Sequence, residues 1–284
     1  MIIEVIRFVF YSGIIVLISK YVLTNVLRKL AEALKLKAKT VGNIAGITTS
    51  IPEFLTITIS SIMGFPGAGL YNILSSNIIN LIQYFGTICF NKNIYKLNNG
   101  AVKVGMILVI LTIIIPLFFI GFNLEVNGFI VFLFICLYIL FLMLNWSASK
   151  LYLKEEKDDT RYNLLIKNKK FKIMLYIFIL LLSGVALFFI SNGLGNSIRE
   201  LCVLFSVPEA TIGILLGFIT SIPELITFFE AQKYYKMEKN EMSGVVEATN
   251  NLLTSNCMNL FVIQVISVII TGRIWESDFL GLKV

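Results

Sequence analysis

Long apolar runs are the feature of this chain that most restricts its fold. Runs of about 18 or more residues recur along nearly the whole length of the 284 residues, and each can cross about 30 Å of hydrocarbon as a helix. Hydrophobic residues make up 57% of the chain and charged residues only 14%, a balance far from that of soluble domains. The sequence lacks the alternating pattern of an outer-membrane barrel. We therefore predict an all-α integral membrane protein.

The apolar runs predict about eight membrane-spanning helices, which we place at 3–27, 41–63, 67–90, 104–122, 128–146, 173–197, 211–231 and 244–270. Positive charge is concentrated in the connections that follow the odd-numbered spans, which hold 19 of the 24 lysine and arginine residues. Under the positive-inside rule these connections face the cytoplasm and the N-terminus faces outward. Because the sequence shows no organelle-targeting signal, we expect a multi-pass protein of a prokaryotic plasma (inner) membrane.

A polar segment of mixed charge separates two related halves of the chain. We assign 1–149 to a first membrane repeat, 150–172 to a cytoplasmic linker and 173–284 to a second membrane repeat. The stretch 40–53 aligns without gaps on 211–224, and both end in Thr-Ser-Ile-Pro-Glu. Because five spans precede the linker, the second repeat enters the bilayer from the opposite side. This is the inverted-repeat architecture of many secondary transporters.

A second motif is shared by the two halves further along each repeat. Its polar residues in the first half are Asn72, Ser76, Asn77 and Asn80, and they recur in the second half as Asn251, Ser255, Asn256 and Asn259. The related segments thus extend over 40–80 and 211–259. Both motifs lie within apolar segments, where polar side chains need a physical reason to be present.

The acidic residue that ends each copy of the first motif is the strongest functional signal. Placing Glu53 or Glu224 at membrane depth costs about 3 kcal/mol or more, and neither span offers a basic residue to pair with it. Pro52 and Pro223 each remove a backbone donor, so we expect each span to break or kink just before its glutamate. Groups freed by such a break are tolerated where they line a cavity or meet an ion.

The oxygen-bearing side chains around these glutamates predict a cation-binding site. The candidate ligands are the carboxylates of Glu53 and Glu224, the hydroxyls of Thr49, Ser50, Ser76, Thr220, Ser221 and Ser255, and the amides of Asn77, Asn80, Asn256 and Asn259. Carboxylate, hydroxyl and amide oxygens without sulfur or imidazole match a hard cation such as Ca²⁺ or Na⁺, and two carboxylates balance one divalent ion. The alternative is that the serines and asparagines hydrogen-bond across helices.

Position on the helix separates the roles expected of the second motif. Ser76 and Asn80 are four residues apart, as are Ser255 and Asn259, so each pair shares one helix face and can point at the same spot. The remaining pair, Asn77 and Asn256, lies about 100° away around the helix. These two asparagines either bind the ion or brace the broken partner helix.

The duplicated pairing of Thr-Ser-x-Pro-Glu with a downstream Asn-x-x-x-Ser-Asn-x-x-Asn segment resembles the α-repeats of the sodium/calcium exchanger membrane family, the cation/Ca²⁺ exchangers. The resemblance implies antiport without a cofactor: one central site, alternately exposed to each side, binds Ca²⁺ through two glutamates, and Na⁺ or H⁺ uses overlapping oxygens. The family's ligand positions carry onto Thr49, Ser50, Glu53, Ser76 and Asn80, and onto Thr220, Ser221, Glu224, Ser255 and Asn259.

The resemblance also sets an expectation for the number of helices. The family has ten spans, five in each half, whereas the apolar runs here predict five plus three, with the second half apparently truncated. A non-transporting relative, or a form completed by self-association or a second subunit, is the alternative that this difference suggests. Glu247 lies near the start of the last predicted span, where we expect a solvated carboxylate at the membrane interface.

Other functional classes fit the sequence less well. Exchange of K⁺, Mg²⁺ or Mn²⁺ is an alternative within transport. The chain has no histidine, and Cys89, Cys136, Cys202 and Cys257 are scattered singly, which argues against zinc, haem and an intramembrane enzyme. Its net charge is +7, and the basic residues lie in connections between spans without interleaved aromatic residues. We therefore expect inorganic cations and the lipid bilayer as partners, and not nucleic acid.

Overall fold

The protein is described here by a computed structural model that covers residues 2–34, 36–51, 53–54, 57–58, 66–122, 128–152, 169–205 and 209–263. All regular structure in these ranges is helical, as predicted. The elements are α1 (Ile2–Ile18), η1 (Ser19–Leu23), α2 (Thr24–Leu34), α3 (Ala38–Thr49), α5 (Pro66–Phe90), η2 (Ile94–Asn98), α6 (Gly100–Gly121), α7 (Gly128–Tyr152), α8 (Lys169–Phe205), α9 (Glu209–Thr220), α10 (Ile222–Met237), α11 (Glu241–Cys257) and η3 (Met258–Ile263).

Six helical stretches within the described ranges are long and apolar enough to cross a membrane. They are Ile3–Ala31, Tyr71–Phe90, Gly100–Phe118, Phe129–Leu151, Lys170–Leu187 and Gly213–Met237. The outer helices expose large apolar side chains, such as Phe129 (73% exposed) on α7 and Leu181 (65%) on α8, which suits contact with lipid. The multi-pass helical class is thus confirmed, whereas the count of eight spans and the five-plus-three division stay predictions.

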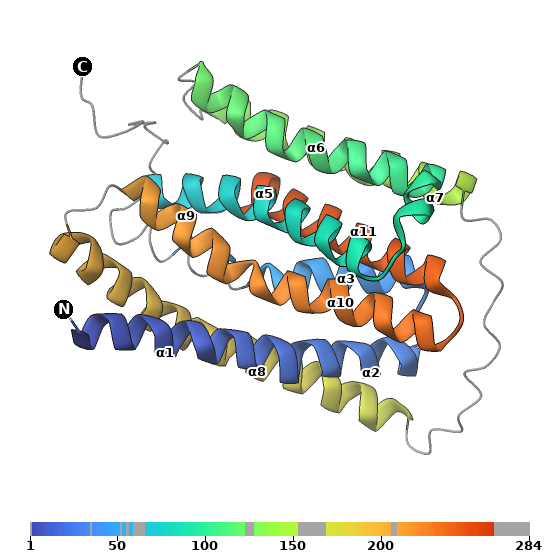
Figure 1. The fold of residues 1–284 in the computed structure, drawn as a ribbon, viewed down its shortest axis with the longest axis horizontal. Helices are drawn as coiled ribbons and strands as arrows, with labels where there is room; N and C mark the ends of the chain where they lie inside the picture. Colours follow the sequence, from blue (N-terminus) through green and yellow to red (C-terminus); the bar gives the residue numbers. More distant parts are fainter. Residues whose placement is uncertain are drawn as a thin grey trace.

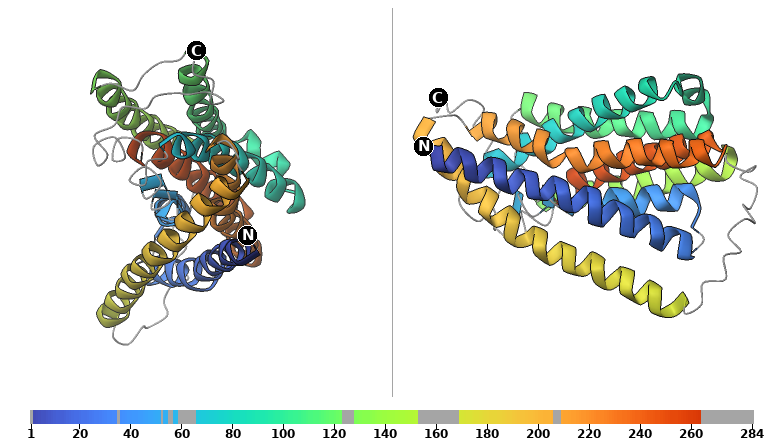
Figure 2. Two further views of the ribbon diagram at one scale, coloured as in Figure 1. Left: turned by 90° about the vertical axis from the view of Figure 1, so that its left-hand side faces the viewer. Right: turned by 60° about the horizontal axis from the view of Figure 1, so that its bottom comes forward.

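The helices form three layers (Figures 1 and 2). The helices α1, α2 and α8 lie on one side, and α6 and α7 lie on the other, with α3, α5, α9, α10 and α11 between them. Buried Ile15 and Leu23 pack with Leu187 and Leu194 to join α1 and η1 to α8. The opposite layer is joined to the centre by an apolar cluster, in which Val109 on α6 lies in the same core as Leu252 on α11. The ring of Phe261 lies against those of Phe134 and Phe141 on α7.

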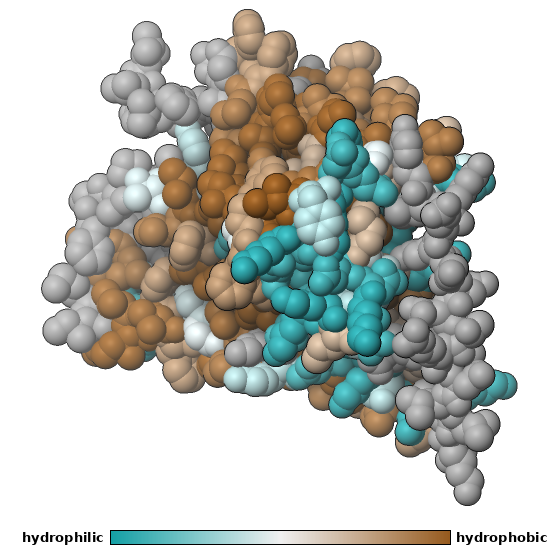
Figure 3. Space-filling model, turned by 45° about the vertical axis from the view of Figure 1, so that its right-hand side comes forward, coloured by the Kyte–Doolittle hydropathy of each residue, from teal (hydrophilic) through white to brown (hydrophobic). Residues whose placement is uncertain are grey.

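Hydrophilic side chains gather at one end of the bundle (Figure 3). This basic end, as we call it, comprises the described residues of the connections 28–40, 91–103, 147–172 and 232–243. Exposed lysines there include Lys37, Lys92, Lys103, Lys233 and Lys239. Figure 1 shows this end at the right, where α2, α5 and α10 finish and where α3, α6 and α11 begin. Its position matches the face that we predict to be cytoplasmic.

The central helices exchange partners between the two halves of the chain. Helix α3, from the first half, packs on α11, and α9, from the second half, packs on α5. Figure 1 shows that α3 runs away from the basic end whereas α9 and α10 run toward it, and that α5 and α11 also have opposite directions. Each Thr-Ser-Ile-Pro-Glu helix therefore packs on the Asn/Ser helix of the other repeat.

Equivalent glycines permit these two close contacts. A Cβ atom added at Gly46 would lie 2.7 Å from the carbonyl oxygen of Asn251 and 2.9 Å from the backbone nitrogen of Ser255. One added at Gly217, the aligned glycine of the second half, would lie 2.8 Å from the carbonyl oxygen of Asn72. All three distances are too short for a Cβ atom, so glycine sets the helix separation at each contact.

The chain turns at the same motif position in both halves. Helix α3 ends at Thr49 and α9 ends at Thr220, and the next residues have nearly the same backbone angles: φ −80°, ψ 0° at Ser50, and φ −81°, ψ −4° at Ser221. Helix α10 starts directly afterwards, with Pro223 in its first turn, which confirms the predicted interruption before Glu224. Pro52, for which we predicted the same effect, lies outside the described residues.

Candidate cation-binding site

The twelve candidate ligand residues are all buried, each with no more than 2% of its surface exposed. Glu53 and Glu224 are fully buried, and they lie near enough to one another for their charges to repel. Neither carboxylate forms an ion pair with any described residue. Helix packing between the halves creates this arrangement, because α3 and α9, which lead into the two Thr-Ser-Ile-Pro-Glu copies, pack on α11 and α5 respectively.

A chain of hydroxyl groups joins one repeat to the carboxylate of the other. The Ser255 hydroxyl donates to Glu224 Oε1 at 3.0 Å, and Ser50 Oγ lies 2.9 Å from Ser255 Oγ. The Thr49 hydroxyl donates to the carbonyl oxygen of Ala45 within α3 at 3.0 Å. On the other side, the Ser76 and Thr220 hydroxyls donate to Asn72 Oδ1 at 3.0 and 3.5 Å. Hydroxyls from both repeats thus lie near Glu224, and hydroxyls from both repeats also meet at Asn72.

Many buried oxygen atoms in this region have no hydrogen-bond partner. They are both carboxylate oxygens of Glu53, Oε2 of Glu224, Oγ of Ser221 and the Oδ1 atoms of Asn80 and Asn259. A buried polar atom left without a partner costs about 1–3 kcal/mol, and more when it is charged. All of these atoms can accept a hydrogen bond or contact a cation, and carboxylate, hydroxyl and amide oxygens are ligands that Ca²⁺ takes.

The number of carboxylates limits the chemistry of the site. The described part of the chain contains no group of three or more His, Cys, Asp or Glu side chains that could hold a metal ion. A cation here depends on two carboxylates together with neutral hydroxyl and amide oxygens. That donor set suits a hard cation that exchanges readily, and it does not resemble the closed sulfur and nitrogen sites of structural zinc.

Four of the six asparagines of the second motif form a reciprocal network. The amide nitrogen of Asn77 lies 3.4 Å from the carbonyl oxygen of Asn256, and that of Asn256 lies 3.2 Å from the carbonyl oxygen of Asn77. The amides of Asn80 and Asn259 donate to the side-chain oxygens of Asn256 and Asn77 at 3.3 and 3.2 Å. Equivalent residues thus make equivalent bonds, as a pseudo-twofold relationship between α5 and α11 requires.

This network bears on the two alternatives that the sequence left open for Asn77 and Asn256. The side-chain oxygens of Asn77 and Asn256 accept hydrogen bonds from the partner helix, which matches the bracing alternative. In Asn80 and Asn259 only the amide nitrogen is engaged, and the side-chain oxygen has no hydrogen-bond partner among the described residues.

Two further polar residues were not among the predicted ligands. Asn72 accepts the hydroxyls of Ser76 and Thr220, and its equivalent Asn251 donates to Thr227 Oγ1 at 2.5 Å while its own Oδ1 has no partner. Their signal in the sequence is the spacing, since each lies one helical turn before the serine of its motif.

Our expectation for Glu247 is wrong. Its side chain is 4% exposed instead of solvated, and both of its oxygens are held by Arg28, with Nη1 to Oε2 at 2.8 Å and Nη2 to Oε1 at 2.6 Å. The physical reason is that α2 lies across the start of α11 and brings a guanidinium to a carboxylate 219 residues away. Nothing in the local sequence around Glu247 indicates that partner.

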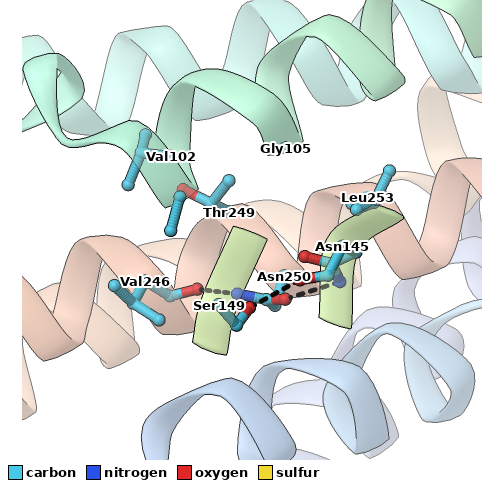
Figure 4. Close-up of a pocket in the computed structure, with 9 residues that line it drawn as sticks. Val102, Gly105, Asn145, Ser149, Val246, Thr249, Asn250 and Leu253 are labelled. Carbon is cyan, nitrogen blue, oxygen red and sulfur yellow. Dashed lines mark hydrogen bonds between the residues drawn. The ribbon is translucent and has the colours of Figure 1, made fainter. Parts of the chain in front are cut away.

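A surface crevice between α6, α7 and α11 lies apart from the twelve residues (Figure 4). It has an empty volume of about 240 Å³, including space that is open to the surroundings, and none of the candidate ligands lines it. Asn145 donates to Asn250 Oδ1 at 3.0 Å within it, and Lys39 Nζ donates to Asn145 O and Ser149 Oγ. Burial lowers the pKa of Lys39 to about 8. A basic group there does not suit a cation.

Comparisons with known proteins agree with the motif analysis. A family model described as sodium/calcium exchanger protein matches residues 5–147 and 175–283. The sodium-calcium exchanger NCX_Mj soaked with 10 mM Na⁺ and zero Ca²⁺ is 18% identical over 94% of this chain and 83% of that chain, with a TM-score of 0.54. Its structure soaked with 2.5 mM Na⁺ and 10 mM Sr²⁺ gives 17% identity, coverage of 94% and 82%, and a TM-score of 0.50. Comparison with curated proteins yields no match.

Proposed function

The chain belongs to the sodium/calcium exchanger protein family, and from that premise we propose that it is a secondary active antiporter that exchanges Ca²⁺ for Na⁺ or H⁺ across a membrane. The transported ion binds between Glu53 and Glu224 and is alternately exposed to each side of the bilayer. The helical membrane fold and the match over both halves support this proposal. We further propose that the basic end faces the cytoplasm of a prokaryotic cell and that the N-terminus lies outside.

The observation that carries the proposal is the set of buried oxygen atoms without hydrogen-bond partners, which includes oxygens of both carboxylates. Two buried negative charges without a basic partner are expensive at membrane depth unless a cation or protons neutralise them. One divalent ion balances both charges, and so do two Na⁺ ions or two protons. The divalent ion competes with Na⁺ or protons for one pair of carboxylates. This competition couples the inward movement of one ion to the outward movement of the other.

The roles of the twelve residues follow from their contacts. We assign the carboxylates of Glu53 and Glu224 to charge neutralisation and direct binding. The neutral ligands in this proposal are Thr49, Ser50, Ser76, Asn80, Thr220, Ser221, Ser255 and Asn259. Asn77 and Asn256 hold the two Asn/Ser helices together and orient the amides of Asn80 and Asn259, so their effect on the ion is indirect.

The test is ion flux in proteoliposomes with the purified protein. We expect an imposed Na⁺ or H⁺ gradient to drive Ca²⁺ uptake, and Glu53→Gln and Glu224→Gln each to abolish it. Glu241→Gln is the matched control, because Glu241 pairs with Lys96 at the basic end and is not a candidate ligand. Ca²⁺ flux that persists in both glutamine variants defeats the proposal. Competition by K⁺, Mg²⁺ or Mn²⁺ identifies a different cargo.

A further inference from the structure

Helix α11 carries a line of oxygen-bearing side chains that leads from the basic end to the candidate site. Glu247, Asn251 and Ser255 are spaced four residues apart, which places them on one helix face, and the line spans about 12 Å along the axis. Ser255 contacts Glu224 at the inner end of this line. The first repeat has Ala68 at the position equivalent to Glu247, so the acid at the outer end belongs to the second repeat alone.

At the outer end of the line, the carboxylate of Glu247 is occupied by a tethered cation. Arg28 contacts both of its oxygens, and the guanidinium carbon lies 4.6 Å from the centre of the Tyr234 ring. Tyr235 also hydrogen-bonds Glu247. Of the ion pairs formed within the described ranges, this is the one that joins the layer of α1, α2 and α8 to the central helices.

Between this ion pair and the candidate site lies a further buried side-chain oxygen, that of Asn251. Asn251 donates its amide to Thr227 on α10, and its Oδ1 is buried without a partner. A cation that leaves Glu247 toward Ser255 meets this oxygen after one helical turn. A purely structural ion pair does not require such an acceptor behind it, and apolar residues of similar size often stabilise a buried contact at least as well.

We propose that Glu247 is a second cation station, on the route between the basic end and the central site, and that the Arg28 guanidinium occupies it while the route is closed. When the route opens, a transported divalent or monovalent cation replaces the guanidinium at the carboxylate and moves on by way of Asn251 Oδ1. The Tyr234 ring keeps the displaced guanidinium nearby without neutralising it. The inference rests on the proposed transport function.

Equilibrium binding tests the station without any need for transport. In a Glu53→Gln/Glu224→Gln background the central carboxylates are gone, so we expect calorimetry of the purified protein with Ca²⁺ to show no binding. Adding Arg28→Gln is expected to create one weak Ca²⁺ site, and adding Glu247→Gln to that variant is expected to remove it. Absence of the new site in a folded Arg28→Gln protein overturns the inference. Arg28→Lys, which keeps the charge but loses the two-point contact, provides a second variant for the same titration.

Flux measured from one side at a time tests the place of the station on the route. We expect Arg28→Gln to lower the half-saturating Ca²⁺ concentration at the basic end by about tenfold, because a competing cation is removed, and to leave the opposite side unchanged. Glu247→Gln is expected to raise it at the basic end alone, and Glu241→Gln on the same helix to change neither side. The inference is overturned if the single variants change the half-saturating Ca²⁺ concentration equally on both sides and the Arg28→Gln/Glu247→Gln double variant restores the wild-type value. That result indicates a purely structural ion pair.

The two proposals fail in different ways. If the wild-type protein shows no Ca²⁺ flux but the Arg28→Gln background gains the Glu247-dependent site, the station stands and the transport proposal falls. If flux depends on Glu53 and Glu224 but no Arg28 variant changes binding or sidedness, the transport proposal stands and the station falls.

Discussion

The buried carboxylates of this protein occupy two kinds of surroundings. Glu247 is matched by a guanidinium that contacts both of its oxygens, whereas Glu53 and Glu224 lie among oxygen atoms and have no basic partner among the described residues. In a matched pair the two charges neutralise each other and the contact links two helices. An unmatched pair still needs its charge neutralised, which in our proposal is done by a cation. These carboxylates differ in their partners and not in their depth of burial, because the cation beside Glu247 belongs to the chain itself.

The largest expected effect distinguishes these two groups by function. Replacing Glu53 or Glu224 by glutamine removes half of the charge that holds a divalent ion, which we expect to weaken Ca²⁺ binding by about 100-fold or more. Thermal stability without Ca²⁺ is expected to stay the same or rise, because an uncompensated buried charge is gone. Calcium titration and a melting curve on each variant check both parts. A loss of stability in the ion-free protein contradicts the comparison.

The matched pair should show the opposite behaviour in its stability. Glu247→Gln leaves the Arg28 guanidinium buried without its partner, and breaking such a pair costs about 3 kcal/mol. We expect the double variant Arg28→Gln/Glu247→Gln to recover most of that loss, since no charge is left unpaired. Denaturation of the purified protein gives the coupling energy between the two sites. Additive losses show that the pair does not act as a unit.

The two helix contacts between the halves should respond alike to a methyl group. Gly46→Ala and Gly217→Ala each place a Cβ atom within 2.9 Å of the partner backbone, and we expect each to cost about 1–3 kcal/mol. Gly86→Ala is the control, because a Cβ atom there meets nothing within 4 Å and alanine favours a helix. Melting temperatures of the three variants test this. Tolerance of alanine at one glycine alone breaks the equivalence of the two repeats.

The asparagine brace should produce a smaller effect that is also symmetric. Asn77→Ala and Asn256→Ala each remove hydrogen bonds between α5 and α11, for which about 1 kcal/mol is expected in a membrane helix bundle. Calcium affinity is expected to fall as well, because Asn259 and Asn80 lose the groups that orient their amides. Stability and calcium titrations measure the two effects separately. Loss of affinity from only one of the variants indicates unequal roles.

The smallest effect is expected at the ion pair between Lys96 and Glu241. Lys96 lowers the pKa of Glu241, whose side chain is 36% exposed, so solvent screens most of the interaction and less than about 1 kcal/mol is expected. The contribution is present above the ordinary glutamate pKa of about 4.3 and is lost as the pH falls through the lower folded value. Melting curves of wild type and Glu241→Gln should therefore converge on acidification. A difference that grows at low pH contradicts this assignment.

Much of the architecture could be predicted because it follows from local sequence patterns. The helical class, the turn before Glu224 and the related motifs at 40–80 and 211–259 follow from apolar length, proline chemistry and direct comparison of the halves. The partner of each motif helix could not be predicted in the same way. Nothing in the local sequence of Gly46 or Gly217 says that these residues face the Asn/Ser helix of the opposite repeat.

By itself the sequence determined that two acidic residues lie in apolar helices, each beside hydroxyl groups and each in the same duplicated setting. Hydropathy and spacing report what a segment is, so these features needed no partner to be recognised. Only the tertiary structure decided that Glu247 is matched by Arg28, and that the side-chain oxygens of Asn77 and Asn256 accept hydrogen bonds whereas those of Asn80 and Asn259 have no partner among the described residues. These roles depend on contacts between residues far apart in the chain, and the packing of whole helices brings those residues together.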